Sequence, residues 1–203
     1  MFSVKKLIYP SFLYHNSRGR ARVLFLVLGV LCVALSAGVF PVVAQQDNSS
    51  WPMFGNTPSH QGVSSSTAPA TNYTLWSYTT GDRVGSSPSV SDGVVFVGSW
   101  DDNIYALNAS TGAKIWNYTT GGDVTSSPAV ADGVVFVGSR DKKVYALNGS
   151  TGAKIWSYTT SSGIYSSPAV ADGVVFIGSD DFNVYALNAS TGSLIWSFTS
   201  AST

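Results

Sequence analysis

The chain has 203 residues, is rich in aromatic side chains (13%), poor in charged ones (11%) and formally neutral. This length allows one domain of ordinary size with a substantial apolar core. Five basic residues precede residue 23, whereas after Ala44 six basic and eleven acidic residues leave a net charge of −5. A mildly acidic body without a basic stripe argues against nucleic acid as a partner.

Cysteine and histidine are too scarce for the usual metal and nucleophile sites. Cys32 is the only cysteine and lies in an apolar run, so the body of the protein forms neither a disulfide nor a cysteine-ligated metal site. His60 is the only histidine beyond the amino-terminal leader, and we interpret it as a surface loop residue. We therefore assign no catalytic residues and no metal ligands.

The amino-terminal part has the pattern of an export signal. Residues 1–22 are basic and residues 23–44 carry no charge. Residues 1–44 are predicted to be either a cleaved signal peptide or a signal anchor, because the apolar run is long enough to span a bilayer. The protein is thus expected to be exported to the periplasm, the cell surface or the medium, with membrane contact only if the leader is retained.

Residues 45–74 are polar and rich in Ser, Thr, Asn and Pro, which predicts a linker and lead-in to the folded body. This segment contains one apolar island, Trp51 to Phe54. A linker alone would not need the island, so we expect it to pack on the folded body. His60 and Gly62 are expected to close the segment.

Residues 75–203 are organised by a repeat of 40 residues. Near-copies run over 76–115, 116–155 and 156–195, and residues 196–203 begin a further copy. A fixed period of this size indicates units that bury their apolar faces against their neighbours. Each copy begins with a tryptophan: Trp76, Trp116, Trp156 and Trp196.

Turn residues divide the middle copy into predicted strands at 127–131, 134–138, 144–147 and 154–159. Asp132-Gly133, a strong hairpin pattern, joins the first two strands. The second strand is apolar throughout, which predicts that both of its faces are covered. The expected fold is all-β: β-propeller blades of four antiparallel strands, three blades plus one extra outer strand near Trp76.

Three blades do not close a ring, since closed propellers have roughly four to eight. An open array with exposed edges, self-association into a six-bladed ring and a shortened chain are the expected alternatives.

The motif ALNASTGAKIW, from Ala106 to Trp116, recurs at 146–156 and, with two replacements, at 186–196. It resembles the tryptophan-docking motif of pyrroloquinoline quinone (PQQ)-type propeller repeats, which implies structural docking roles for the repeat tryptophans. Residues 51–62 resemble the lead-in to the first blade of that family. The resemblance covers residues 51–203 and leaves function open, because the repeat occurs in enzymes and non-enzymes.

Comparison of the copies separates constant turns from variable loops. The Asp-Gly hairpin and the Asn-(Ala/Gly)-Ser-Thr-Gly turn recur, whereas the second-to-third loops and the approaches to the first strands differ. In an up-and-down meander both variable sets lie on one face, and such loops are the usual place for binding, although drift in solvent is the alternative. The predicted binding face comprises Arg83, Trp100, Asp101, Asp102, Arg140, Asp141, Lys142, Lys143, Tyr165, Asp180, Asp181 and Phe182.

The predicted function is that of a non-catalytic binding or scaffold module with a surface protein or glycan as partner and no cofactor. The first alternative is a fragment or relative of a PQQ-dependent quinoprotein dehydrogenase. The resemblance then implies PQQ with calcium, for which the chain offers the pairs Asp101-Asp102 and Asp180-Asp181 but neither Glu nor a cysteine pair. The second alternative resembles the propeller lipoprotein that assists outer-membrane β-barrel assembly.

Asn-X-Ser/Thr sequons mark possible glycosylation sites. Three of them lie in the repeated turn, which needs Asn and Ser for its own geometry. The sequons are at Asn48, Asn72, Asn108, Asn117, Asn148 and Asn188.

Overall fold

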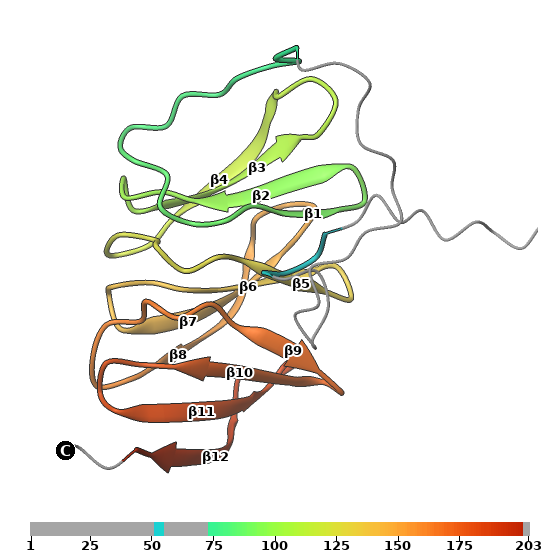
Figure 1. Ribbon diagram of the computed structural model, residues 1–203. Helices are drawn as coiled ribbons and strands as arrows, with labels where there is room; N and C mark the ends of the chain where they lie inside the picture. Colours follow the sequence, from blue (N-terminus) through green and yellow to red (C-terminus); the bar gives the residue numbers. More distant parts are fainter. Residues whose placement is uncertain (1–50, 55–72, 201–203) are drawn as a thin grey trace, which may run out of the picture. The chain divides into compact units, whose positions relative to one another are not determined.

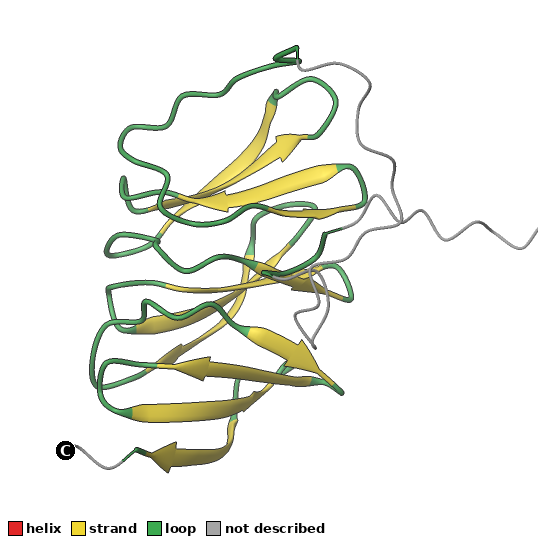
Figure 2. Cartoon of the chain, in the orientation of Figure 1, coloured by secondary structure: helices red, strands yellow, loops and turns green. Residues whose placement is uncertain are grey.

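The structure, a computed structural model, describes residues 51–54 and 73–200. The predicted leader, His60, Gly62 and the sequons at Asn48 and Asn72 lie outside these residues. Within them the chain forms strands and loops (Figure 2), and no helix there is long and apolar enough to cross a membrane.

The described residues form three antiparallel sheets of four strands, each an up-and-down meander (Figure 1). The all-β, four-stranded blade prediction is therefore confirmed. The extra outer strand predicted near Trp76 is not formed, because residues 73–80 pair with no other strand in the described part of the chain. Blade 1 comprises β1 (Ser89–Ser91), β2 (Val94–Gly98), β3 (Asn103–Asn108) and β4 (Lys114–Thr119). Blade 2 comprises β5 (Ala129–Ala131), β6 (Val134–Gly138), β7 (Lys143–Asn148) and β8 (Lys154–Thr159). Blade 3 comprises β9 (Ala169–Ala171), β10 (Val174–Gly178), β11 (Asn183–Asn188) and β12 (Leu194–Thr199).

The constant turns are constant because their backbone geometry requires these residues. Asp132 and Gly133 both have positive φ (50° and 72°), the combination of a type I′ hairpin turn, which Asp-Gly adopts readily. In the outer turn the Asn148 side chain accepts a hydrogen bond from the Thr151 amide at 2.9 Å. Gly152 then takes φ of 73°. A side chain at this glycine would also collide with the docked tryptophan of the preceding blade.

The outer strands of blades 1 and 2 each dock a tryptophan onto the next blade. The Trp116 indole of blade 1 donates to the Gly149 carbonyl of blade 2 at 2.8 Å. Its ring lies 5.8 Å from Phe96 between centroids. Trp76 and Trp156 make the same bond, to the carbonyl oxygens of residues 109 and 189 at 2.8 and 2.9 Å. Trp196 has no further blade beside it in the described residues and is 46% exposed.

Burial follows the position of each blade in the stack. In β6, Val135, Phe136 and Val137 are all buried, so both faces of the strand are covered, as its unbroken apolar run predicts. In β10 of blade 3, Phe176 is only partly buried. The central blade is therefore sandwiched between two neighbours, whereas the described part of the chain leaves one face of blade 3 open.

The apolar island ahead of the repeats packs on the inner strands. Trp51 forms an antiparallel bridge with Val90 of β1, and the Pro52 carbonyl accepts from the Val130 amide of β5 at 2.6 Å. Met53 is 4% exposed and belongs to the apolar core that residues of blades 2 and 3 form together. The island thus bridges the inner strands of two blades.

Candidate binding face

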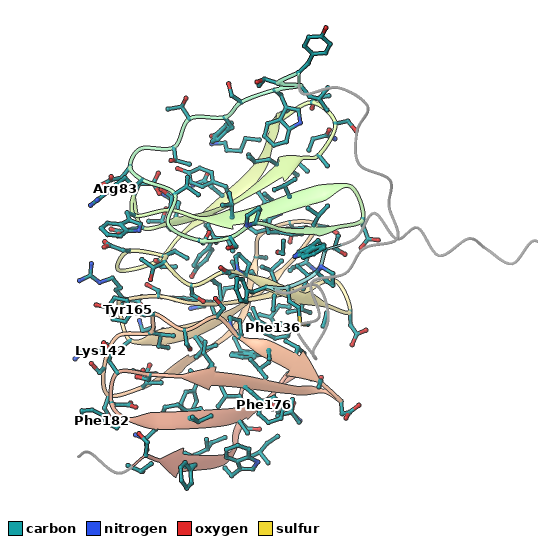
Figure 3. All side chains as sticks on the ribbon, viewed as in Figure 1. Arg83, Phe136, Lys142, Tyr165, Phe176 and Phe182 are labelled. Carbon is teal, nitrogen blue, oxygen red and sulfur yellow. The ribbon has the colours of Figure 1, made fainter. Side chains whose placement is uncertain are left out.

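The variable loops lie together along one edge of the stacked blades. In blade 1 the Trp100 amide donates to the Arg83 carbonyl at 2.9 Å, which joins the second-to-third loop to the approach segment. In blade 3 the Asp180 amide makes the same bond to the Gly163 carbonyl at 3.0 Å. Both variable sets therefore share one face. Figure 3 shows four of its side chains at the left edge of the view: Arg83, Lys142, Tyr165 and Phe182.

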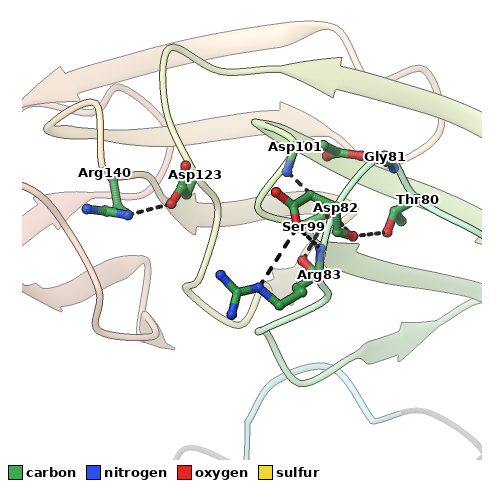
Figure 4. Close-up of polar contacts among 8 residues, drawn as sticks. All are labelled: Thr80, Gly81, Asp82, Arg83, Ser99, Asp101, Asp123 and Arg140. Carbon is green, nitrogen blue, oxygen red and sulfur yellow. Dashed lines mark hydrogen bonds and ion pairs between the residues drawn. The ribbon is translucent and has the colours of Figure 1, made fainter.

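An aspartate at the second position of each loop fastens that loop to its own blade. In blade 1, Oδ2 of Asp101 accepts from the Gly81 amide and from the Tyr105 hydroxyl, both at 2.6 Å. Oδ1 accepts from the backbone and side-chain amides of Asn103, at 3.1 and 3.2 Å. Figure 4 shows Asp101 beside Gly81. The same position holds Asp141 and Asp181 in the other blades, each with a tyrosine hydroxyl as donor.

The ionisation of this network follows from its hydrogen bonds. Burial alone would raise the pKa of Asp101, but the bonds from Tyr105, Gly81 and Asn103 outweigh it and lower the pKa below the usual value. Burial, followed by the bond to Asp101, raises the pKa of Tyr105. At neutral pH the pair is a carboxylate with a neutral phenol donating to it.

These aspartates do not fit a calcium site. Both carboxylate oxygens of Asp101 already accept two hydrogen bonds each, so their four lone-pair directions are directed at donors. Asp181 accepts the equivalent bonds from Ser161, Asn183 and Tyr185. No group of three His, Cys, Asp or Glu side chains that could hold a metal occurs in the described part of the chain. In each predicted pair one aspartate, Asp101 or Asp181, therefore has no carboxylate lone pair left for a metal ion, and we derive no chemistry through PQQ.

Arginine and aromatic side chains make up the more exposed part of the face. The Arg83 guanidinium lies 4.0 Å from the ring centroid of Trp100 in blade 1. Arg140 of blade 2 donates from Nε to the Tyr165 hydroxyl at 3.0 Å and pairs with Asp123 (Figure 4). The Arg140 contact links the loop of blade 2 to the approach of blade 3.

The third loop position projects its side chain from a left-handed backbone. Asp102, Lys142 and Phe182 have φ of 67°, 73° and 68°. Non-glycine residues adopt this conformation at some cost. The Phe182 ring is nevertheless 60% exposed, and Lys142 is exposed as well. Lys143 begins β7 and is half-buried.

The predicted site residues thus fall into two groups. The aspartates at 101, 141 and 181 hold the loops from within, and the repetition of Asp at this position in all three loops is the sequence pattern that distinguishes them. Of the remaining residues, Arg83, Arg140, Lys142, Tyr165, Asp180 and Phe182 are exposed, whereas Trp100, Asp102 and Lys143 are partly buried. Their role in binding stays a prediction.

A repeated Ser-Ser-Pro segment, which the sequence analysis did not single out, links neighbouring blades. The Ser87 amide donates to the Ser127 hydroxyl at 2.8 Å, and the Ser127 amide donates to the Ser167 hydroxyl at 3.0 Å. The triplet recurs at 86–88, 126–128 and 166–168, and this recurrence is the sequence pattern that points to a shared structural role.

In the repeated turn, the sequon asparagines accept hydrogen bonds through their side-chain oxygen. Oδ1 of Asn108 accepts from the Thr111 amide at 2.9 Å, and Asn188 does the same. Nδ2 of Asn117 donates to Asn103 at 3.0 Å. Glycosylation of the described sequons stays a prediction.

Residues 59–203 match the family model described as outer membrane protein assembly factor BamB, a PQQ-type repeat model. The chain belongs to this family. The predicted resemblance to PQQ-type propeller repeats is thereby confirmed. No curated protein sequence matches the chain significantly.

Solved structures similar to the chain include a BamB and quinohemoprotein alcohol dehydrogenases. BamB from Moraxella catarrhalis is 26% identical with a TM-score of 0.56, over 62% of this chain and 39% of that one. The quinohemoprotein alcohol dehydrogenase ADHIIG from Pseudomonas putida HK5 is 28% identical with a TM-score of 0.64, over 73% and 26%. The quinohemoprotein alcohol dehydrogenase from Comamonas testosteroni is 26% identical with a TM-score of 0.63, over 73% and 27%. The chain spans well under half the length of each.

Proposed function

We propose that the protein is a non-catalytic, exported binding module that holds a protein partner on its loop face. The observation that carries the proposal is a row of arginine and aromatic side chains across the blades: the exposed Arg83 over the partly buried Trp100, Arg140 beside Tyr165, and Phe182. Arginine, tryptophan and tyrosine are the residues most enriched at binding hot spots. Rigid strands behind the loops lower the entropy lost on binding.

The family supports a protein rather than a glycan as the partner. The matching model is described as an assembly factor for outer membrane proteins, and proteins are what such a factor handles. Export is consistent with the basic and apolar leader.

Site-specific photo-crosslinking in the host tests this proposal. A photoreactive amino acid replaces Lys142, which is exposed on the loop face of the central blade. The matched control replaces Ser150, which is also exposed, in the turn of the same blade. We expect a discrete protein adduct from position 142 that is absent from position 150 and falls several-fold when Arg140→Ala is added. Equal adducts from both positions, or none from either, would contradict the proposal.

The dehydrogenase alternative has support from the quinohemoprotein relatives but none from the loop aspartates. Dye-linked oxidation of alcohols after addition of PQQ and calcium measures it directly. Turnover that disappears in Asp101→Asn and Asp181→Asn, with folding retained, would favour the enzyme over the binding module.

A further inference from the structure

The open face of blade 3 has the form of the blade interfaces within the chain. Phe176 and Trp196 lie 5.9 Å apart between ring centroids, as do Phe136 and Trp156 at the interface between blades 2 and 3. Yet Trp196 is 46% exposed, whereas Trp156 is 9% exposed. Phe198, on the same side of β12, is 64% exposed. The apolar docking surface is formed but uncovered.

Beside this surface lies an unfilled hollow. In blades 1 and 2 a glycine at the end of the second strand makes room for a side chain from the next blade. A Cβ on Gly98 would lie 2.5 Å from Val124, and one on Gly138 would lie 2.2 Å from Ile164. At Gly178 the nearest atom is the Ser166 hydroxyl, at 3.5 Å. An open pocket of about 530 Å³, lined by Gly178, Phe182 and Val184 among others, occupies this place in blade 3.

Blade 1 carries the side chain that fits the hollow. Val84 stands one repeat before Val124 and two before Ile164. Val124 and Ile164 are fully buried, whereas Val84 is 50% exposed. An apolar side chain is therefore exposed at one end of the array, and the glycine hollow for it is open at the other.

Blade 1 also has a tryptophan-docking site of the kind that β12 would fit, and residues 76–80 of the same chain occupy it. Trp76 donates to the Ala109 carbonyl at 2.8 Å, and Tyr78 lies 5.5 Å from Tyr105 between ring centroids. Residues 73–80 belong to no sheet, whereas β12 pairs with β11 along its length. The sequences WSYTT at 76–80 and WSFTS at 196–200 follow the same pattern, so both fit this site.

We propose that blade 3 of one copy docks on blade 1 of a second copy of the chain. In this contact β12 replaces residues 76–80 on blade 1, and Val84 of the second copy enters the hollow at Gly178. Exchange of one tryptophan for another is close to neutral, so the gain comes from the newly buried Val84, Phe176 and Val184. Two such contacts give a closed, two-fold symmetric dimer, and one contact per copy gives longer chains.

The proposal predicts opposite effects for two equivalent tryptophans. Trp196→Ala removes the docking side chain and should weaken self-association at least tenfold. Trp76→Ala weakens the competing segment and should strengthen self-association. Ile195→Ala, on the other side of β12 and 51% exposed, is the matched control and should change little. Sedimentation velocity of the exported protein over a range of concentrations measures all three.

Filling the hollow is an independent test. A Cβ at Gly178 would make only ordinary contacts with Ser166 in a single copy, so Gly178→Val should retain the unfolding midpoint of the monomer and abolish association. Wild type and Trp76→Ala that both stay monomeric up to about 100 µM would overturn the proposal. Association that persists unchanged in Trp196→Ala and Gly178→Val would overturn it as well. None of these substitutions touches Lys142 or Arg140, so failure here is distinct from failure of the loop-face function.

Discussion

Ser89 buries a hydroxyl group in the inner strand of blade 1. The residue is fully buried, and its Oγ has no hydrogen-bond partner in the described part of the chain. Ala129 and Ala169 occupy the equivalent positions, each opposite the phenylalanine of the second strand. Blade 1 therefore carries a polar group where the other two blades have a methyl group.

We expect Ser89→Ala to stabilise the protein by about 1 kcal/mol, because it removes the desolvation cost of an unpaired hydroxyl. Ser99→Ala is the control: its hydroxyl is also fully buried but bonds to the loop of blade 1, so its loss should destabilise. Free energies of unfolding in denaturant measure both. A destabilised Ser89→Ala variant would mean that the hydroxyl has a partner in the folded protein.

The Asp181–Tyr185 pair makes stability depend on pH at both extremes. Burial raises the pKa of Asp181, but hydrogen bonds led by Tyr185 outweigh it and leave the pKa lowered. Burial and the bond to Asp181 raise the pKa of Tyr185 to about 12. A carboxyl group with a lowered pKa in the folded protein contributes stability above its unfolded pKa of about 4. This contribution is lost as the pH falls through the folded pKa. A phenol with a raised pKa in the folded protein contributes stability below its unfolded pKa of about 10. This contribution is lost as the pH rises towards the folded pKa.

We therefore expect a stability plateau between about pH 5 and 9, with losses on both sides. Asp181→Asn should be less stable than wild type on the plateau and should lose less on the acid side. Tyr185→Phe should likewise flatten the alkaline side. Unfolding free energies measured across pH test this, and variants with the same pH slopes as wild type would remove the pair as the cause.

At the scale of the element, the outer strand derives its stability from the blade that follows it. Trp116 of β4 lies between two blades and is 9% exposed, while Trp196 of β12 is 46% exposed. The same residue at the same position of two equivalent strands thus differs in burial because of the neighbouring blade.

Trp116→Ala should destabilise the protein by about 3–5 kcal/mol, since it leaves a large cavity between blades 1 and 2. Trp196→Ala should cost less than about 1 kcal/mol when measured in dilute, monomeric protein. Denaturant unfolding of the two variants side by side gives the comparison. Equal losses would show that the exposed tryptophan is covered in solution.

At the scale of the whole molecule, each blade contacts only its neighbours, so protection should vary along the array. Blade 2 has a blade on each side, and its β6 is almost completely buried. All six residues of β12 are exposed. The sheet hydrogen bonds alone do not distinguish the blades, because the three registers are equivalent.

Hydrogen exchange should accordingly be slowest in β6 and β7 and fastest in β12 when the protein is dilute. Amide exchange followed by mass spectrometry resolves these segments. The protection of β12 should rise with protein concentration if a second copy covers it. Uniform protection across the three blades in dilute protein would contradict nearest-neighbour stability.

Much of the fold is predictable from local patterns in the repeat. Asp132-Gly133 predicts its hairpin because few dipeptides take positive φ at both positions, and the predicted bounds of β6 and β8 match the structure. The first strand of the middle blade is shorter than predicted, since residues 127 and 128 belong to the Ser-Ser-Pro link between blades. That link joins residues 40 positions apart, and no local pattern reveals such a contact.

The blade can be derived from the amino-acid sequence alone, through its period, its turns and the tryptophan that begins each copy. The sequence also places the variable loops on one face, because a meander sends alternate connections to the same side. Which loop residues are available for binding depends on contacts that form in the folded chain. Asp101 is turned inward by Tyr105 and the Gly81 amide, while Arg83 lies outward on Trp100. The physical reason is that a residue's chemistry is local, whereas its partners are supplied by segments distant in the sequence. The same holds for Val84 and Val124, whose burial is set by the blade beside them.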